Sequence, residues 1–165
     1  MRGNLIAKPA RGALLAALLA CMAAGTQLAG AAPTAWRDDA TGFAIAGFDP
    51  VAYYTQHKPL PGESGIEHRW GGVVWRFVNT GNKEAFSKHP QVYAPLFAGY
   101  DPEALSRGLT VRGSPVVWSV HEGRIIFFRD ATALRAWAEN PQRLAGLAET
   151  NWKRLSREIP GTSGY

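Results

Sequence analysis

An internal repeat constrains this 165-residue chain more than any other feature. Residues 67–96 align with residues 118–147, an offset of 51. In each copy an apolar run meets a two-residue turn, Gly71-Gly72 or Glu122-Gly123, and a second apolar run returns. A helical stretch then follows and stops before a proline, so the repeat predicts two β-hairpins, each followed by a helix. The aligned pairs include Gly72 with Gly123, Phe77 with Phe128, Asn79 with Asp130, Phe86 with Trp137 and Pro90 with Pro141.

Two hairpin–helix units predict an α+β fold, in which an antiparallel sheet carries its helices on one face. Trp75 and Phe77 alternate with less apolar neighbours, which suits a strand buried on one face. Asp130 is a good N-cap for the second helix, and Thr80 or Asn82 for the first. The strands are expected at residues 67–70, 73–78, 116–120 and 124–128, and a final amphipathic helix at residues 141–155.

The segment before the repeat contains Gly47-Phe48-Asp49-Pro50-Val51-Ala52-Tyr53-Tyr54. Residues 41–47 are short, apolar and bounded by glycines, which predicts a strand. Asp49 suits the capping position of a helix, and Pro50 suits its first turn, where a missing N–H costs nothing. We therefore expect a helix that starts at Asp49 and ends before Pro59.

The N-terminal residues are typical of an export signal. Residues 1–31 contain three basic residues and no acidic one, followed by an apolar run too short to span a membrane. Two interpretations remain open: cleavage near Ala31, or a lipoprotein signal in which Cys21 is acylated. We expect a signal peptide at 1–31, a linker at 32–44, one domain at 45–156 and a disordered tail at 157–165. The protein is then exported and periplasmic, with membrane attachment only through a lipid on Cys21.

Composition excludes some classes of function. Without the three basic residues of the signal, 15 basic residues face 13 acidic ones, a net charge of about +2. No basic stripe is present, so nucleic acid is not an expected partner. The only cysteine is Cys21, so the domain can use neither disulfides nor thiolate ligands.

Several motifs together resemble the YHS-domain family, and more closely its small exported members. The resemblance covers roughly residues 45–155. It rests on Gly47–Tyr54, Gly71-Gly72-Val73-Val74-Trp75-Arg76-Phe77, Asn82-Lys83-Glu84-Ala85-Phe86, Pro90-Gln91-Val92-Tyr93-Ala94-Pro95, Gly99-Tyr100 and Asn151-Trp152.

The resemblance implies metal binding, which is commonly suggested for YHS domains. This chain departs from the family at one informative place. Relatives usually read Gly-Tyr-Cys-Ala where this chain reads Gly99-Tyr100-Asp101-Pro102. Because a hard oxygen donor replaces the thiol, a soft metal is disfavoured, and the cofactor is left unknown.

Five residues form the candidate ligand site: Asp49, Tyr53, Trp75, Tyr100 and Asp101. Each has a structural alternative. Asp49 can simply cap a helix while Tyr53 packs on the sheet, Asp101 suits a type I turn, and tryptophans in a disulfide-free domain commonly form its core.

No catalytic motif accompanies these residues. The histidines His57, His68, His89 and His121 show no metal-binding spacing, and no nucleophile elbow, P-loop or dinucleotide fingerprint occurs. We therefore expect a non-enzymatic exported binding module for a metal ion or small ligand. The alternative is an accessory module that contacts an envelope protein and binds no small ligand.

Overall fold

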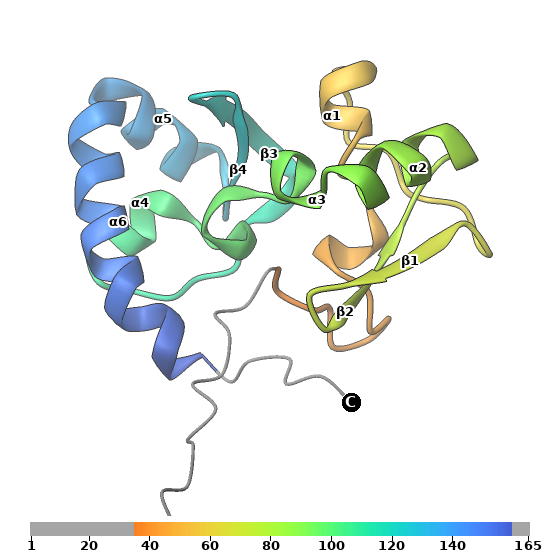
Figure 1. Ribbon diagram of the computed structural model, residues 1–165. Helices are drawn as coiled ribbons and strands as arrows, with labels where there is room; N and C mark the ends of the chain where they lie inside the picture. The colour runs from red at the N-terminus through yellow and green to blue at the C-terminus, as the bar shows by residue number, and fades with distance from the viewer. Residues whose placement is uncertain (1–34, 160–165) are drawn as a thin grey trace, which may run out of the picture.

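The computed structural model describes residues 35–159 (Figure 1). The expected signal peptide, Cys21 and residues 160–165 lie outside this part. In chain order the elements are η1 (Ile45–Gly47), α1 (Ala52–Thr55), β1 (Glu67–Trp70), β2 (Val73–Arg76), α2 (Thr80–Lys88), α3 (Pro90–Tyr93), η2 (Leu96–Gly99), α4 (Pro102–Ser106), β3 (Ser114–His121), β4 (Arg124–Phe128), α5 (Ala131–Glu139) and α6 (Pro141–Glu158). The α+β class and the two predicted hairpins are confirmed.

The two hairpins form separate two-stranded antiparallel sheets, which corrects the single sheet expected from the sequence. β1 pairs with β2 from Glu67↔Arg76 to Trp70↔Val73, and β3 pairs with β4 through a bulge after Ser114. The second edge of β2 is taken by residues 43–44: Phe43 bridges Val74, and the Ala44 N–H donates to the Val74 carbonyl at 2.8 Å. Figure 1 shows the hairpins in different parts of the molecule, each accompanied by its own helices.

Residues 41–47 do not form the predicted strand. Phe43 and Ala44 make single bridges, and the chain then enters the short turn η1. Ile45, Ala46 and Gly47 have φ angles of 45°, 55° and 78°, so all three lie in the left-handed region. A short apolar run between glycines does not distinguish a strand from a left-handed turn, because periodicity alone cannot assign the structure of so few residues.

The repeat extends further towards the N-terminus than the sequence alignment indicated. η2 reproduces η1, since Phe97, Ala98 and Gly99 have φ angles of 53°, 53° and 80°. Each left-handed turn precedes an Asp-Pro pair and a short helix. We call residues 44–94 the first unit and residues 96–145 the second unit.

Equivalent hydrogen bonds define this duplication. The Asp49 N–H donates to the Leu60 carbonyl at 2.8 Å, and the Asp101 N–H donates to the Val111 carbonyl at 2.8 Å. Two glycines occupy a second pair of matching positions. The Gly62 N–H donates to Gly47 at 2.9 Å, and the Gly113 N–H donates to Gly99 at 3.0 Å. A Cβ at Gly62 or Gly113 would overlap residues 76–77 or 127, so neither position admits a larger residue.

The helix expected from Asp49 is shorter than predicted, since α1 spans Ala52–Thr55. In α2, α5 and α6 the boundaries follow the caps and prolines more closely. The side chains of Asn79 and Asp130 accept hydrogen bonds from the first turns of α2 and α5. Asn79 is therefore the N-cap of α2, in place of Thr80 or Asn82. His89 and Asn140 end these helices, and Pro90 or Pro141 opens the next one.

Trp36 joins the two units. Its backbone N–H donates to Ala98 at 2.9 Å, its indole Nε1–H donates to Gly99 at 3.0 Å, and its carbonyl accepts from Ile45 at 3.2 Å. Ala35 and Trp36 are buried, so the segment expected as a linker is part of the domain from residue 35 onward. At the other end α6 continues to Glu158, beyond the expected start of the tail.

One core spans both units. Val73, Trp75 and Phe77 of the first unit are buried together with Ile125 and Phe127 of the second. The alternate residues of β4 pack against α5, so both faces of β4 are covered. Among the described helices, none combines the length and apolar character needed to cross a bilayer.

We predict that Asp49→Asn and Asp101→Asn destabilise the fold, whereas Asp130→Asn does not. At 49 and 101 the new amide NH₂ would face backbone N–H donors that now meet a carboxylate oxygen. The free energy of unfolding should fall by about 2–4 kcal/mol for Asp49→Asn and about 1–2 kcal/mol for Asp101→Asn. Asp130→Asn should change it by less than about 0.5 kcal/mol, because Asp and Asn cap helices equally well and the bond that would be lost, from Arg129 Nε, is exposed to water.

Chemical denaturation of the three variants measures these values. Equal, small losses for all three would show that the second carboxylate oxygen is unimportant.

Candidate functional site

Asp49 is fully buried, and hydrogen bonds use its whole carboxylate. Oδ1 accepts from the Val51 and Ala52 N–H groups at 2.8 and 3.3 Å, as a helix cap does. Oδ2 accepts from the Val78 N–H at 2.8 Å and from Asn82 Nδ2 at 2.7 Å. A carboxylate has about four lone-pair sites, so these four donors fill the acceptor capacity of Asp49.

Asp101 is the counterpart of Asp49. Its Oδ1 accepts from the Glu103 and Ala104 N–H groups at 2.9 and 3.4 Å, and its Oδ2 accepts from the Arg129 N–H at 3.1 Å. Asp101 caps α4 rather than forming an isolated turn. Burial raises the pKa of its carboxyl group, and these backbone donors oppose that rise.

Tyr53 and Trp75 lie in the core of the first unit. Both side chains are buried; Tyr53 donates to the Pro115 carbonyl at 2.8 Å, and Trp75 Nε1 donates to the Trp70 carbonyl at 3.1 Å. The Tyr53 ring also packs edge-on against Trp118, with centroids 5.1 Å apart. The structure therefore places Tyr53 and Trp75 in one core cluster. The hydrogen bonds of Asp49 go to Val51, Ala52, Val78 and Asn82.

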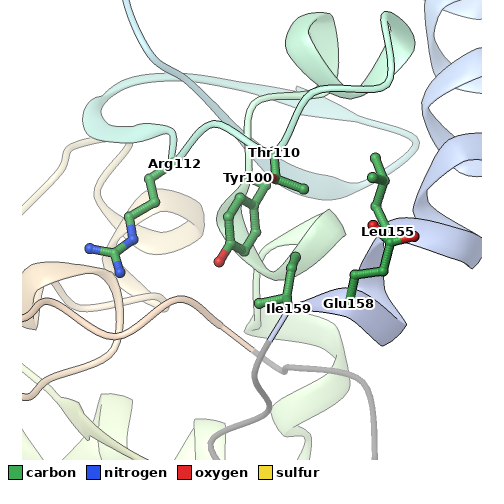
Figure 2. Close-up of a pocket in the computed structure, with 6 residues that line it drawn as sticks. All are labelled: Tyr100, Thr110, Arg112, Leu155, Glu158 and Ile159. Atoms are coloured by element: carbon green, nitrogen blue, oxygen red, sulfur yellow. The ribbon is translucent and has the colours of Figure 1, made fainter.

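A pocket of about 400 Å³ opens on the second unit, beside Tyr100. Figure 2 shows Arg112 and Tyr100 on one side of it and Leu155, Glu158 and Ile159 of the C-terminal helix region on the other. Of the five predicted site residues, Tyr100 lines this pocket. The lining residues are Tyr100, Thr110, Arg112, Leu155, Glu158 and Ile159.

The second half of α6 holds the wall of the pocket in place. Asn151 Nδ2 donates to the carbonyls of Leu105 and Ser106 at 2.8 and 3.3 Å, at the end of α4. The neighbouring Trp152 packs on Tyr100, with ring centroids 5.7 Å apart. The Asn-Trp pair thus positions the ring of Tyr100 and the pocket residues that follow on α6.

Two exposed ion pairs flank the pocket. Arg112 binds both carboxylate oxygens of Asp39, at 2.9 and 3.3 Å. The hydrogen bond and charge of Arg112 lower the pKa of Asp39, and Asp39 in turn raises the pKa of Arg112. At the other side Arg154 Nη1 lies 3.1 Å from Glu158 Oε1, an i, i+4 pair on α6.

The carboxylate oxygens of Asp49 and Asp101 are already engaged in hydrogen bonds. Every oxygen of these two carboxylates already accepts from backbone or amide donors. Within residues 35–159, no three His, Cys, Asp or Glu side chains are grouped so that they could hold a metal ion.

Sequence reasoning missed Thr110, Arg112, Leu155, Glu158 and Ile159. A signal was present in the repeat. By the equivalent hydrogen bonds, Tyr100, Thr110 and Arg112 correspond to Phe48, Pro59 and Pro61 of the first unit. The repeat alignment began at residue 67, and so it left these positions uncompared.

The chain matches no protein-family model, no curated protein and no solved structure. The geometry of the pocket and the comparison between its own two units are therefore the basis for assigning function.

We predict that Tyr53 ionises only when the protein unfolds. Burial, and then the charge of Asp49, raise the pKa of Tyr53 far above its ordinary value of about 10. Burial also raises the pKa of Tyr54. Because the folded-state pKa exceeds that of the unfolded chain, stability is full below about pH 10 and is lost as the pH rises above it.

Absorbance at alkaline pH should show a delayed tyrosine component that appears together with loss of the near-ultraviolet circular dichroism signal. Tyr53→Phe should reduce this component. A single early titration of all tyrosines, in a protein that stays folded, would contradict the prediction.

Proposed function

We propose that this chain is an exported, non-enzymatic YHS-like binding module, and that its ligand is a small organic molecule held beside Tyr100. The volume of about 400 Å³ falls in the range of small-molecule sites. Leu155, Ile159 and the ring of Tyr100 supply an apolar surface, and a few polar groups surround it, as such sites commonly have.

One observation carries this proposal: the polar lining of the pocket is not required by the fold. The first unit builds the same backbone with Phe48, Pro59 and Pro61. The second unit places a phenol, a hydroxyl and a guanidinium at those positions. Folding explains the glycines and the capping aspartates, which both units share, but it does not explain this difference.

The pocket also depends on an element that only the second unit has. After α3 (Pro90–Tyr93) the chain passes directly into η2, whereas α6 continues through Glu158. This extension supplies Leu155 and Glu158, and Ile159 follows it. The extension that distinguishes the second unit from the first therefore lies at the pocket.

A three-compound titration tests the proposal. Benzoate, benzylamine and benzyl alcohol share an apolar ring and differ in charge, so at least one should bind if the pocket takes small organic ligands. We expect saturable amide chemical-shift changes at Tyr100, Thr110, Arg112 and Ile159, with a dissociation constant of about millimolar order for so small a probe.

Thr110→Trp should fill the pocket and weaken binding by about tenfold or more, a loss of about 1.4 kcal/mol. Thr80→Trp is the matched control, because Thr80 is equally exposed but lies on α2 of the first unit. The proposal fails if none of the three compounds gives saturable changes, or if both tryptophan variants weaken binding alike.

A further inference from the structure

The two charges that border the pocket lie at its opposite sides. In Figure 2, Arg112 and Glu158 are separated by Tyr100 and Ile159. The first is a fork of N–H donors that suits a carboxylate, and the second is a carboxylate that suits an ammonium group. Between them the pocket offers the ring of Tyr100 and the side chains of Leu155 and Ile159.

Each charge has an exposed partner that a ligand can replace, and Arg112 also lies over the ring of Trp36, 5.7 Å from its centroid. The side chains of the Arg112–Asp39 pair are 47% and 79% exposed, and those of the Arg154–Glu158 pair are 58% and 60% exposed. Exposed pairs of this kind contribute little to stability, because water screens them and the side chains lose freedom. Asp39 uses two of the five N–H donors of a guanidinium.

Neither charge anchors the repeated framework. The counterpart of Arg112 in the first unit is Pro61, and Glu158 lies on the part of α6 that follows the second unit. The fold therefore leaves both positions free to serve a ligand. A ligand with one charge would satisfy one end of the pocket and leave the other end paired with its surface partner.

We propose that the pocket binds a small zwitterion whose carboxylate and ammonium groups are separated by an apolar segment. Arg112 receives the carboxylate and Glu158 receives the ammonium group. Tyr100, Leu155 and Ile159 contact the apolar segment. ω-Amino acids have this chemistry. Short peptides with apolar side chains carry the same two charged groups, but a polar peptide unit lies between them. This inference rests on the proposed small-ligand function, and it assigns the ligand class of the same pocket.

Calorimetric titration compares 6-aminohexanoate with hexanoate and hexylamine, which have the same apolar chain and one charge each. We expect the zwitterion to bind at least about tenfold more tightly than either, and to lose affinity as salt is added. A second zwitterion, the dipeptide leucyl-alanine, identifies the source: tighter binding of the dipeptide assigns a peptide, and tighter binding of 6-aminohexanoate assigns a free ω-amino acid.

Single-site variants separate the two ends. Arg112→Gln should weaken 6-aminohexanoate and hexanoate but leave hexylamine unchanged, and Glu158→Gln should weaken 6-aminohexanoate and hexylamine but leave hexanoate unchanged. Asp39→Asn should strengthen hexanoate binding, because it removes the competing carboxylate. All three positions are exposed, so the variants should fold, and circular dichroism checks that they do.

The inference is overturned if hexanoate or hexylamine binds as tightly as 6-aminohexanoate, or if the variants affect all three ligands equally. In that case binding of the benzyl probes still supports a small-ligand module. If none of the three benzyl probes binds, the proposed function fails as well.

Discussion

A buried aspartate in each unit is the interaction on which the rest of the structure depends. Asp49 and Asp101 each cap a short helix with one carboxylate oxygen. The other oxygen accepts from a backbone N–H that follows the hairpin: that of Val78, two residues after β2, or that of Arg129, directly after β4. Each therefore ties the start of a unit to the end of its hairpin. Burying a carboxylate is costly unless donors surround it, and the backbone supplies those donors in both units.

The left-handed turns η1 and η2 show what this arrangement tolerates. Ile45 and Phe97 adopt positive φ angles, which cost side-chain-bearing residues about 1–2 kcal/mol each. Such conformations persist only where surrounding contacts determine them. Here Trp36 bonds to both turns, and both Ile45 and Phe97 are buried in the cores. The two strained turns are therefore also the places at which Trp36 joins the two units.

Because the fold is duplicated, a comparison of its two units separates features that the framework needs from features that it does not. Features that both units share, such as the capping aspartates and the close-packed Gly62 and Gly113, belong to the framework. Features that differ are the polar residues at positions 100, 110 and 112 and the extension of α6. These differences gather around one pocket. Asp101 falls in the shared group and has a structural role.

Local patterns in the sequence determined the hairpins, the boundary between α5 and α6 and the α+β class, because turn glycines, caps and prolines act over a few residues. They failed at residues 41–47, where Ala44 bonds to the distant Val74 just before the left-handed turn, and at the sheet, where residues 43–44 occupy the second edge of β2. The candidate site shows the same division. Tyr100 was predicted from a motif, but Arg112 and Glu158 are 46 residues apart in the chain, and only the packing of α6 against α4 brings them to one pocket.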